Sequence, residues 1–175
     1  SRTPRQRGQA RQCRLRKPTG PDTAMLIHDL LSPERISFDV HAGSKKRLLE
    51  IISDELAANS DQLSQREIFE SLIARERLGS TGLGEGVAIP HGRVKGTQGV
   101  EAAFFKLAKP MPFEAADGKP VDILFALAVP EDCGEDHLKL LAHIAELFAE
   151  PGFLDQLRAT EKPSQLLKLL AGTGK

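Results

Sequence analysis

Two short apolar runs in the second half of the chain most constrain its fold. "VEAAFFKLA" (100–108) and "PVDILFALAV" (120–129) are bounded by proline or glycine, and their length and composition are typical of buried strands. Segments with helical spacing precede and follow both runs. Because such an order is typical of a sheet covered on its faces, we expect an α/β fold, three-layered as α/β/α, with a small mixed sheet covered by helices on both faces.

Three longer segments show the spacing of amphipathic helices. In the first, which Ser44 can cap, the apolar positions are Leu48, Leu49, Ile52 and Leu56. The second begins at a capping box formed by Ser64 and Glu67 and ends at Gly79. Its apolar positions are Ile68, Leu72, Ile73 and Leu78. In the third they are Leu138, Leu141, Ala142, Ala145 and Phe148. We also expect a strand at 36–40 and two short helices, at 153–160 and 163–172.

The bulk composition indicates one globular domain without a membrane span. A chain of 175 residues is the size of one ordinary domain, and no apolar run reaches the roughly 18–20 residues that a membrane span needs. Cys13 and Cys133 lie far apart and form neither a metal-binding spacing nor a disulfide framework. This cysteine usage favours a reducing compartment, and we expect a cytoplasmic protein.

The zero net charge hides a strongly basic beginning. Residues 1–24 carry seven Lys/Arg and one Asp, a net charge of +6, whereas the remaining residues carry 17 basic and 23 acidic side chains, a net charge of −6. With almost no apolar content, residues 1–24 are expected to be a basic disordered tail, or upstream sequence that precedes the true start at Met25. A basic arm for nucleic acid is the alternative, and it is disfavoured because no aromatic or folded reader accompanies the arginines.

Between the second helix and the first apolar run lies "GSTGLGEGVAIPHGRV" (79–94), in which five glycines and a proline surround His91. Gly82, Gly84 and Gly86 give G-x-G-x-G, which differs from the dinucleotide-binding G-x-G-x-x-G and precedes a strand-like "GVAI" where a helix would be needed. The segment also lacks the Gly-Lys-Ser/Thr of the P-loop and the G-x-S-x-G of hydrolases. The pattern therefore disfavours nucleotide binding.

The histidines do not form a metal-binding pattern either. There is no H-E-x-x-H, and His137 and His143 are six residues apart, which places them on different faces of a helix. What remains is that His91 acts itself, because a neutral imidazole is a nucleophile near neutral pH. The glycines allow close backbone approach and Pro90 rigidifies the residue before His91, as attack on a bulky phosphoryl group would need.

The stretch "RERLGSTGLGEGVAIPHG" (75–92) resembles the phosphorylation-site signature of the mannitol/fructose-type enzyme IIA domains of the bacterial sugar phosphotransferase system. Within this family the chain is most similar to the nitrogen-regulatory branch. "SKKRLLEIISDELA" (44–57) and "DHLKLLAHIAELF" (136–148) resemble the family's first and later helices, in the expected order. The resemblance runs over about 25–170, and it predicts that 25–175 form a type-2 IIA domain.

The resemblance implies a role for three side chains. His91 falls on the family's phosphorylated histidine, with Nε2 as the phosphorylated nitrogen by analogy. Arg75 falls on the arginine that accompanies that site, and His137 on the second active-site histidine. Ser80 and Thr81 could offer hydroxyls to the phosphate, but turn and cap roles explain them equally well. The phosphoryl donor is expected to be a histidine-containing phosphocarrier protein, and no metal or cofactor is implied.

Two functions stay open at this point. The chain has no membrane span and no room for a IIB module, which favours a regulatory phosphocarrier whose phosphorylation state is the signal. Regulatory targets such as sensor kinases or potassium transport proteins are then expected. The alternative is a sugar-specific IIA that relays phosphate to a IIB component for sugar uptake. In either case the chain is a transient phosphoryl acceptor and donor, and whether it counts as an enzyme stays open.

Overall fold

The computed structural model describes residues 31–58, 63–95, 99–115, 117–131 and 136–173, so the predicted tail, 1–24, lies outside the described residues. In chain order the elements are η1 (Pro33–Arg35), β1 (Ile36–Val40), α3 (Lys45–Ala58), α4 (Gln65–Leu78), β2 (Gly82–Gly84), β3 (Val87–Ala88), β4 (His91–Val94), β5 (Glu101–Met111), β6 (Val121–Pro130), α5 (Asp136–Phe148), α6 (Phe153–Ala159) and α7 (Pro163–Thr173). The predicted strands and helices are all present. Within these described ranges, no helix has the length and hydropathy needed to cross a membrane.

The sheet is mixed, and β6 lies at its centre. Its order is β1-β5-β6-β3-β2, and β4 pairs with β6 as well. The central pair, β5 and β6, is antiparallel, whereas β1 runs parallel to β5, and β3 and β4 run parallel to β6. Nearly every residue of β6 is buried, which explains why its sequence is a continuous apolar run.

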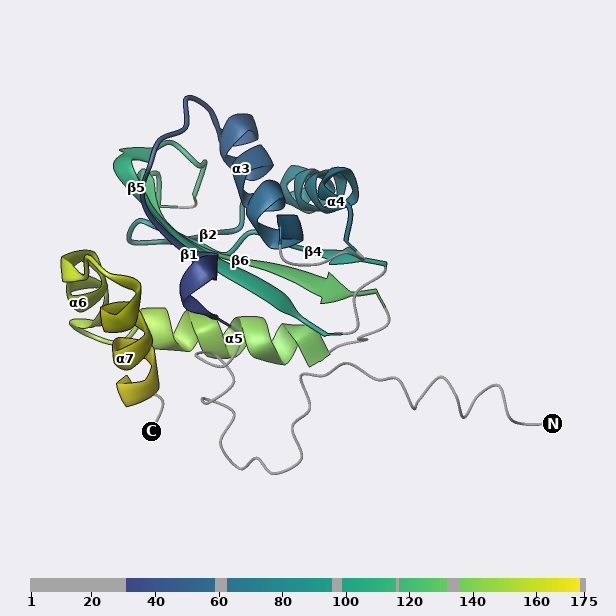
Figure 1. Ribbon diagram of the computed structural model, residues 1–175. Coiled ribbons are helices and arrows are strands. Elements are labelled where there is room, and N and C mark those ends of the chain that lie inside the picture. The colour runs from purple at the N-terminus through teal and green to yellow at the C-terminus, as the bar shows by residue number, and fades with distance from the viewer. Residues whose placement is uncertain (1–30, 59–62, 96–98, 116, 132–135, 174–175) are drawn as a thin grey trace.

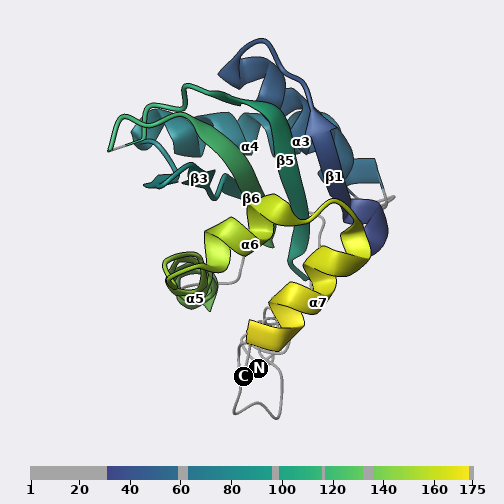
Figure 2. The same cartoon turned by 90° about the vertical axis from the view of Figure 1, so that its left-hand side faces the viewer.

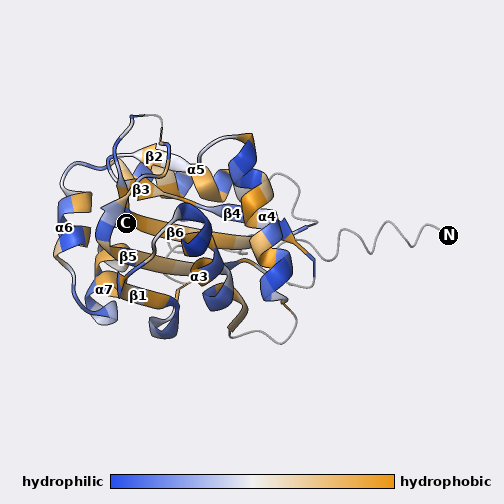
Figure 3. Ribbon diagram, turned by 90° about the horizontal axis from the view of Figure 1, so that it is seen from above, coloured by the Kyte–Doolittle hydropathy of each residue, from blue (hydrophilic) through white to orange (hydrophobic). Residues whose placement is uncertain are grey.

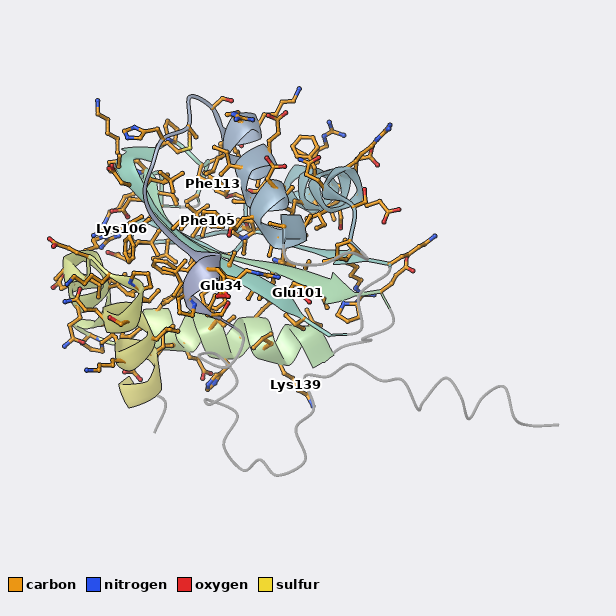
Figure 4. All side chains as sticks on the ribbon, viewed as in Figure 1. Glu34, Glu101, Phe105, Lys106, Phe113 and Lys139 are labelled. Carbon is orange, nitrogen blue, oxygen red and sulfur yellow. The ribbon has the colours of Figure 1, made fainter. Side chains whose placement is uncertain are left out.

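Helices cover both faces of the sheet, so the expected three-layer α/β/α fold is confirmed. Helices α3 and α4 lie on one face, and α5, α6 and α7 lie on the other (Figures 1 and 2). The sheet separates two clusters of buried side chains, one shared with each helical layer. Phe105 and Phe113 belong to the α3 side (Figure 4). Seen from above, the strands between the layers are mostly hydrophobic (Figure 3).

The two helices of the first layer begin where the sequence predicts. The Ser44 hydroxyl accepts a hydrogen bond from the backbone N–H of Arg47 at 3.1 Å, and the Ser64 hydroxyl accepts one from Glu67 at 3.3 Å. Gly79 caps the end of α4, where its N–H donates to Glu76 O at 3.1 Å. Position 79 is therefore the point at which the glycine-rich segment leaves its helix.

Strands β3 and β4 are two pieces of one strand along the same edge of β6. Val87 and Ala88 pair with Ile123 and Leu124, and His91 to Val94 pair with 127–130. Pro90 lies at the break between the two pieces, where it has no N–H to donate, and its carbonyl accepts from Leu127 N at 2.9 Å. The break therefore keeps the strand on β6 while it delivers His91 as the first residue of β4.

Helix α4 packs tightly on β4, and Gly92 makes this approach possible. A Cβ at Gly92 would collide with the Ser71 hydroxyl and would lie 2.9 Å from Ser71 Cβ and 3.0 Å from its backbone carbonyl carbon. The Ser71 hydroxyl also donates to Arg93 O at 2.8 Å. Rotation of the Ser71 side chain would move its hydroxyl but neither its Cβ nor its backbone, so it cannot relieve the contact alone.

The prediction that Leu78 belongs to the buried face of α4 is wrong. Ile68 and Leu72 are buried, but Leu78 is 83% exposed. At about 100° per residue, Leu78 points about 120° away from Leu72, which takes it off the buried stripe. Its position in the last turn of α4, before the chain turns at Gly79, leaves it on the surface.

The predicted apolar stripe of α5 is also wrong at two positions. Of the predicted residues, Leu138 is 53% exposed and Ala142 is exposed. As expected, Phe148 is buried and Leu141 packs, partly buried, against the core. The side chains that α5 buries are Leu140, Ile144, Leu147 and Phe148. Because leucines occur on several sides of this helix, spacing alone admits two stripes, and the one with the larger side chains packs on the sheet.

The close approach of α4 and β4 predicts a large effect of a single methyl group. Gly92→Ala is expected to lower the free energy of unfolding by about 1 to 3 kcal/mol, because the helix has to move away from the strand. Urea denaturation measures the change. Gly43→Ala is the control, because a Cβ there meets no atom within 4 Å. Equal stability of the two variants would contradict the packing described.

Candidate functional site

The His91 side chain is half-buried at the start of β4, and its ring is oriented by the backbone. Its Nδ1 lies 2.9 Å from Ile89 O. A carbonyl oxygen can only accept, so Nδ1 carries the proton, and the lone pair of the neutral ring is on Nε2. This tautomer makes Nε2 the nucleophilic nitrogen.

The strand register places His91 on the face of the sheet that α5 covers. His91 pairs with Leu127, whose side chain is buried in the cluster shared with α5, α6 and α7. Its neighbour Gly92 pairs with Ala128 and faces α4, as the alternation of a strand requires. His91 is thus at the edge of the sheet, on the side away from α4.

Arg75 approaches the same strand from the other layer. It lies one helical turn after Ser71, the residue that contacts Gly92, and so is on the same face of α4. The chain after α4 returns to the start of β4, because Thr81 O accepts from Ile89 N at 3.0 Å. Arg75 is therefore displaced from Ser71 toward the His91 end of the strand. Its Nη1 donates to Gly79 O at 2.8 Å.

His137 is the second residue of α5, and its side chain lies outside the described part of the structure. The chain leaves β6 beside the end of β4, where Glu131 N donates to Val94 O at 3.0 Å. The first turn of α5 lies at this same end of the sheet (Figure 1). The start of α5, which carries His137, is therefore at the end of the sheet where β4 finishes, whereas His91 opens β4 and Arg75 lies toward that start of β4 from α4.

The hydroxyls of Ser80 and Thr81 serve the turn after α4. Ser80 Oγ donates to Phe113 O at 2.9 Å and accepts from Gly82 N at 3.0 Å. Thr81 Oγ1 donates to a carboxylate oxygen of Glu76 at 2.7 Å. The sequence left two roles open for these hydroxyls, phosphate binding and stabilising a turn or cap. In the structure they stabilise the turn.

Strands β2 and β3 are antiparallel and form a glycine-rich hairpin. Its turn, at Glu85 and Gly86, is held by residues that the sequence did not reveal. Arg158 of α6 pairs with Asp122 at 2.9 Å and donates to Glu85 O at 2.7 Å. Gly86 has a φ of +86°, and a Cβ there would collide with the Arg158 guanidinium. Sequence patterns do not place Arg158, because it lies 73 residues from Glu85 along the chain.

Asp117 holds the same hairpin from outside. Its carboxylate accepts from the backbone N–H of Glu85 at 2.9 Å and from that of Lys119 at 3.0 Å. These two hydrogen bonds, the one from Glu85 first, lower the pKa of Asp117 because they stabilise its charged form. Among the residues that the structure describes, no group of three or more His, Cys, Asp and Glu is arranged to hold a metal ion.

Comparisons with known proteins agree on one family. A family model described as "Phosphoenolpyruvate-dependent sugar phosphotransferase system, EIIA 2" matches residues 29–172. A nitrogen regulatory protein of Pseudomonas aeruginosa is 42% identical over 144 residues, which are 82% of this chain and 94% of that protein.

Solved structures point the same way. The crystal structure of nitrogen regulatory protein IIA-Ntr from Neisseria meningitidis has a TM-score of 0.78 at 41% identity, and the match covers 83% of this chain and 99% of that one. The mannitol IIA of Escherichia coli has a TM-score of 0.68 at 20% identity, with 81% and 99% covered, which shows the shared fold.

The hydrogen bond to Ile89 predicts the tautomer of His91 in solution. At a pH where the ring is neutral, the ¹⁵N shifts of His91 are expected to show a protonated Nδ1 and an unprotonated Nε2, because Ile89 O can only accept. Long-range ¹H–¹⁵N spectra measure this, with the exposed His41 as the internal comparison. A His91 ring with its proton on Nε2 would contradict the geometry.

Proposed function

The chain belongs to the EIIA 2 family of the phosphoenolpyruvate-dependent sugar phosphotransferase system, and we propose that it is a regulatory phosphocarrier of the nitrogen-related branch. In this proposal it accepts a phosphoryl group on His91 from a histidine-containing phosphocarrier protein. The observation that carries it is the hydrogen bond from His91 Nδ1 to Ile89 O, which leaves Nε2 as the nucleophile. Similarity to nitrogen regulatory proteins over most of the chain supports the regulatory branch.

The proposed step is a direct exchange between two imidazoles. The Nε2 lone pair of His91 attacks the phosphorus of the donor's phosphohistidine, and a new N–P bond forms. The donor's N–P bond breaks, and its electron pair returns to the donor ring. The His91 ring keeps its proton on Nδ1, where Ile89 O still accepts it, and the positive charge of the ring is balanced by the phosphoryl oxygens. Since one phosphohistidine replaces another, positioning is the main requirement.

Arg75 and His137 are the proposed supports of this step. Arginine has five N–H donors in a planar fork, and the bond from Arg75 to Gly79 O uses one of them. The others match the oxygens of a phosphoryl group. His137 is in the first turn of α5, where the helix dipole and backbone N–H groups favour an anion. Neither residue is phosphorylated in the proposed mechanism.

The phosphorylation state itself is the proposed output. A phosphoryl group adds roughly −1.5 to −2 charges at a surface that a target protein would contact, which is enough to change binding by like-charge repulsion. We assign this role to a type-2 IIA domain over 25–175, acting in the cytoplasm on regulatory targets such as sensor kinases or potassium transport proteins.

Phosphoryl transfer to the intact chain is the central test. Incubated with the phosphorylated phosphocarrier protein, the chain is expected to gain one acid-labile, alkali-stable phosphate, and His91→Ala is expected to gain none. Intact-protein mass spectrometry at alkaline pH counts the phosphates. His143→Ala, which alters another half-buried histidine, is the control and should be labelled normally. Labelling of His91→Ala would refute the assignment of the nucleophile.

A second experiment separates regulation from sugar uptake. The chain phosphorylated on His91 is mixed with purified IIB components of the fructose and mannitol types, and the loss of its phosphate is followed with time. A regulatory protein is expected to keep its phosphate over times in which the cognate sugar-specific IIA transfers it. Rapid transfer to a IIB component would favour the relay.

A further inference from the structure

Glu76, the residue after Arg75, is a buried charge that the proposed mechanism does not use. Its side chain is 7% exposed, and it accepts a charged hydrogen bond from Lys45 of α3, with Nζ 2.8 Å from Oε2. Thr81 supplies two further donors, its N–H to Oε2 at 2.9 Å and its hydroxyl to Oε1 at 2.7 Å. Both carboxylate oxygens are therefore occupied, by the first helix on one side and by the glycine-rich segment on the other.

These contacts continue, bond by bond, to the imidazole of His91. Glu76 fixes Thr81 by its N–H and its hydroxyl. The carbonyl of Thr81 accepts from Ile89 N at 3.0 Å, and the carbonyl of Ile89 accepts from His91 Nδ1 at 2.9 Å. The Ile89 carbonyl, which sets the tautomer of His91, is thus linked to the Glu76 carboxylate through Thr81.

Lys45 is itself fixed, so the carboxylate has a rigid counter-ion. Its Nζ lies 3.3 Å from both Phe113 O and Glu114 Oε1, and 4.4 Å from the centre of the Phe113 ring. Phe113 lies between β5 and α3, where its ring is fully buried (Figure 4). The network therefore joins α3, the end of α4, the glycine-rich segment and the chain that follows β5.

Helix stability does not explain a glutamate at this position. Glu76 is in the last turn of α4, where the helix dipole disfavours a negative charge. A buried ion pair is also weak evidence for stability, since an apolar substitute of the same shape is often as stable. What the carboxylate supplies is directional, charge-assisted bonds to two donors of Thr81.

We propose that Glu76 is a positioning residue of the phosphoryl-transfer site, with Lys45 as its counter-ion and Thr81 as its link to His91. It holds the His91 ring in the orientation and tautomer that present Nε2. Because Glu76 and Arg75 share the last turn of α4, the same anchor fixes the distance between Arg75 and the His91 strand. The proposal rests on the proposed function of His91 for its kinetic effect, but not for its effect on the ring.

Thr81→Val and Thr160→Val form a matched pair of variants. Both threonines are buried, and each hydroxyl makes a hydrogen bond of 2.7 Å, Thr81 to Glu76 and Thr160 to Leu157 O. Only Thr81 is part of the connection to His91. Glu76→Gln removes the charge with little change of shape, and Glu50→Gln, at the Arg47–Glu50 pair on α3, is its control.

The expected result separates the two pairs. Thr81→Val and Glu76→Gln should slow phosphorylation of the full chain by at least about tenfold at saturating phosphorylated carrier, with little change in KM for the carrier, because ring orientation changes and the docking surface does not. Their His91 ¹⁵N signals should shift toward a mixture of tautomers. Thr160→Val and Glu50→Gln should stay within about twofold of the unaltered chain, and Thr81→Ser should restore the rate.

Two outcomes would overturn the proposal. One is a rate within twofold for both Thr81→Val and Glu76→Gln. The other is an equal loss in Thr81→Val and Thr160→Val with unchanged His91 signals, which would indicate a loss of stability alone. If the unaltered chain accepts no phosphate, the proposed function fails, but the ¹⁵N spectra still decide whether Glu76 and Thr81 set the ring.

Discussion

The arrangement of the site depends on the pairing of one interrupted strand with the edge of β6. Strands β3 and β4 both run parallel to β6, and the break between them falls at Ile89 and Pro90. At the break the two carbonyls point in different directions, Pro90 O to Leu127 N on the sheet and Ile89 O to the His91 ring. Successive carbonyls of a strand point to opposite sides, so Pro90 O pairs with β6 and Ile89 O, on the side away from β6, is the acceptor that orients the imidazole.

The requirement for glycine follows from how closely other elements approach this strand. Gly92 lets the α4 backbone reach β4, and Gly86 lets the Arg158 guanidinium reach the hairpin. Neither glycine contacts a phosphate in the proposed mechanism. A glycine-rich stretch beside a nucleophile can therefore serve helix and side-chain packing, where its composition alone would indicate a phosphate-binding loop.

The order of elements was predictable from the sequence because hydrophobic period and cap residues are local signals. The strand at Ile36–Val40 and the caps at Ser44 and Ser64 are where the pattern places them. Which side of α5 is buried was not predictable, because that depends on the sheet it meets and not on its own spacing. Leu138, expected in the core, lies outside for this reason.

The candidate site was likewise predictable only where its signals are local in the sequence. The motif around His91 predicted a nucleophile, and the resemblance added Arg75 and His137 to it. The Lys45–Glu76 pair and the Arg158–Asp122 pair could not be found this way, because each joins residues more than 30 positions apart. Long-range ion pairs leave no periodic trace in a sequence, whereas a cap or a turn does.

Such long-range anchors suit the chemistry proposed for His91. Donor and product are both phosphohistidines, so the bond that forms and the bond that breaks are alike, and the protein has little free energy to supply beyond orientation. A residue that orients the unphosphorylated His91 ring raises the fraction of acceptor molecules that present Nε2 to the donor. A network such as Lys45–Glu76–Thr81 should therefore alter how fast phosphate is transferred to His91.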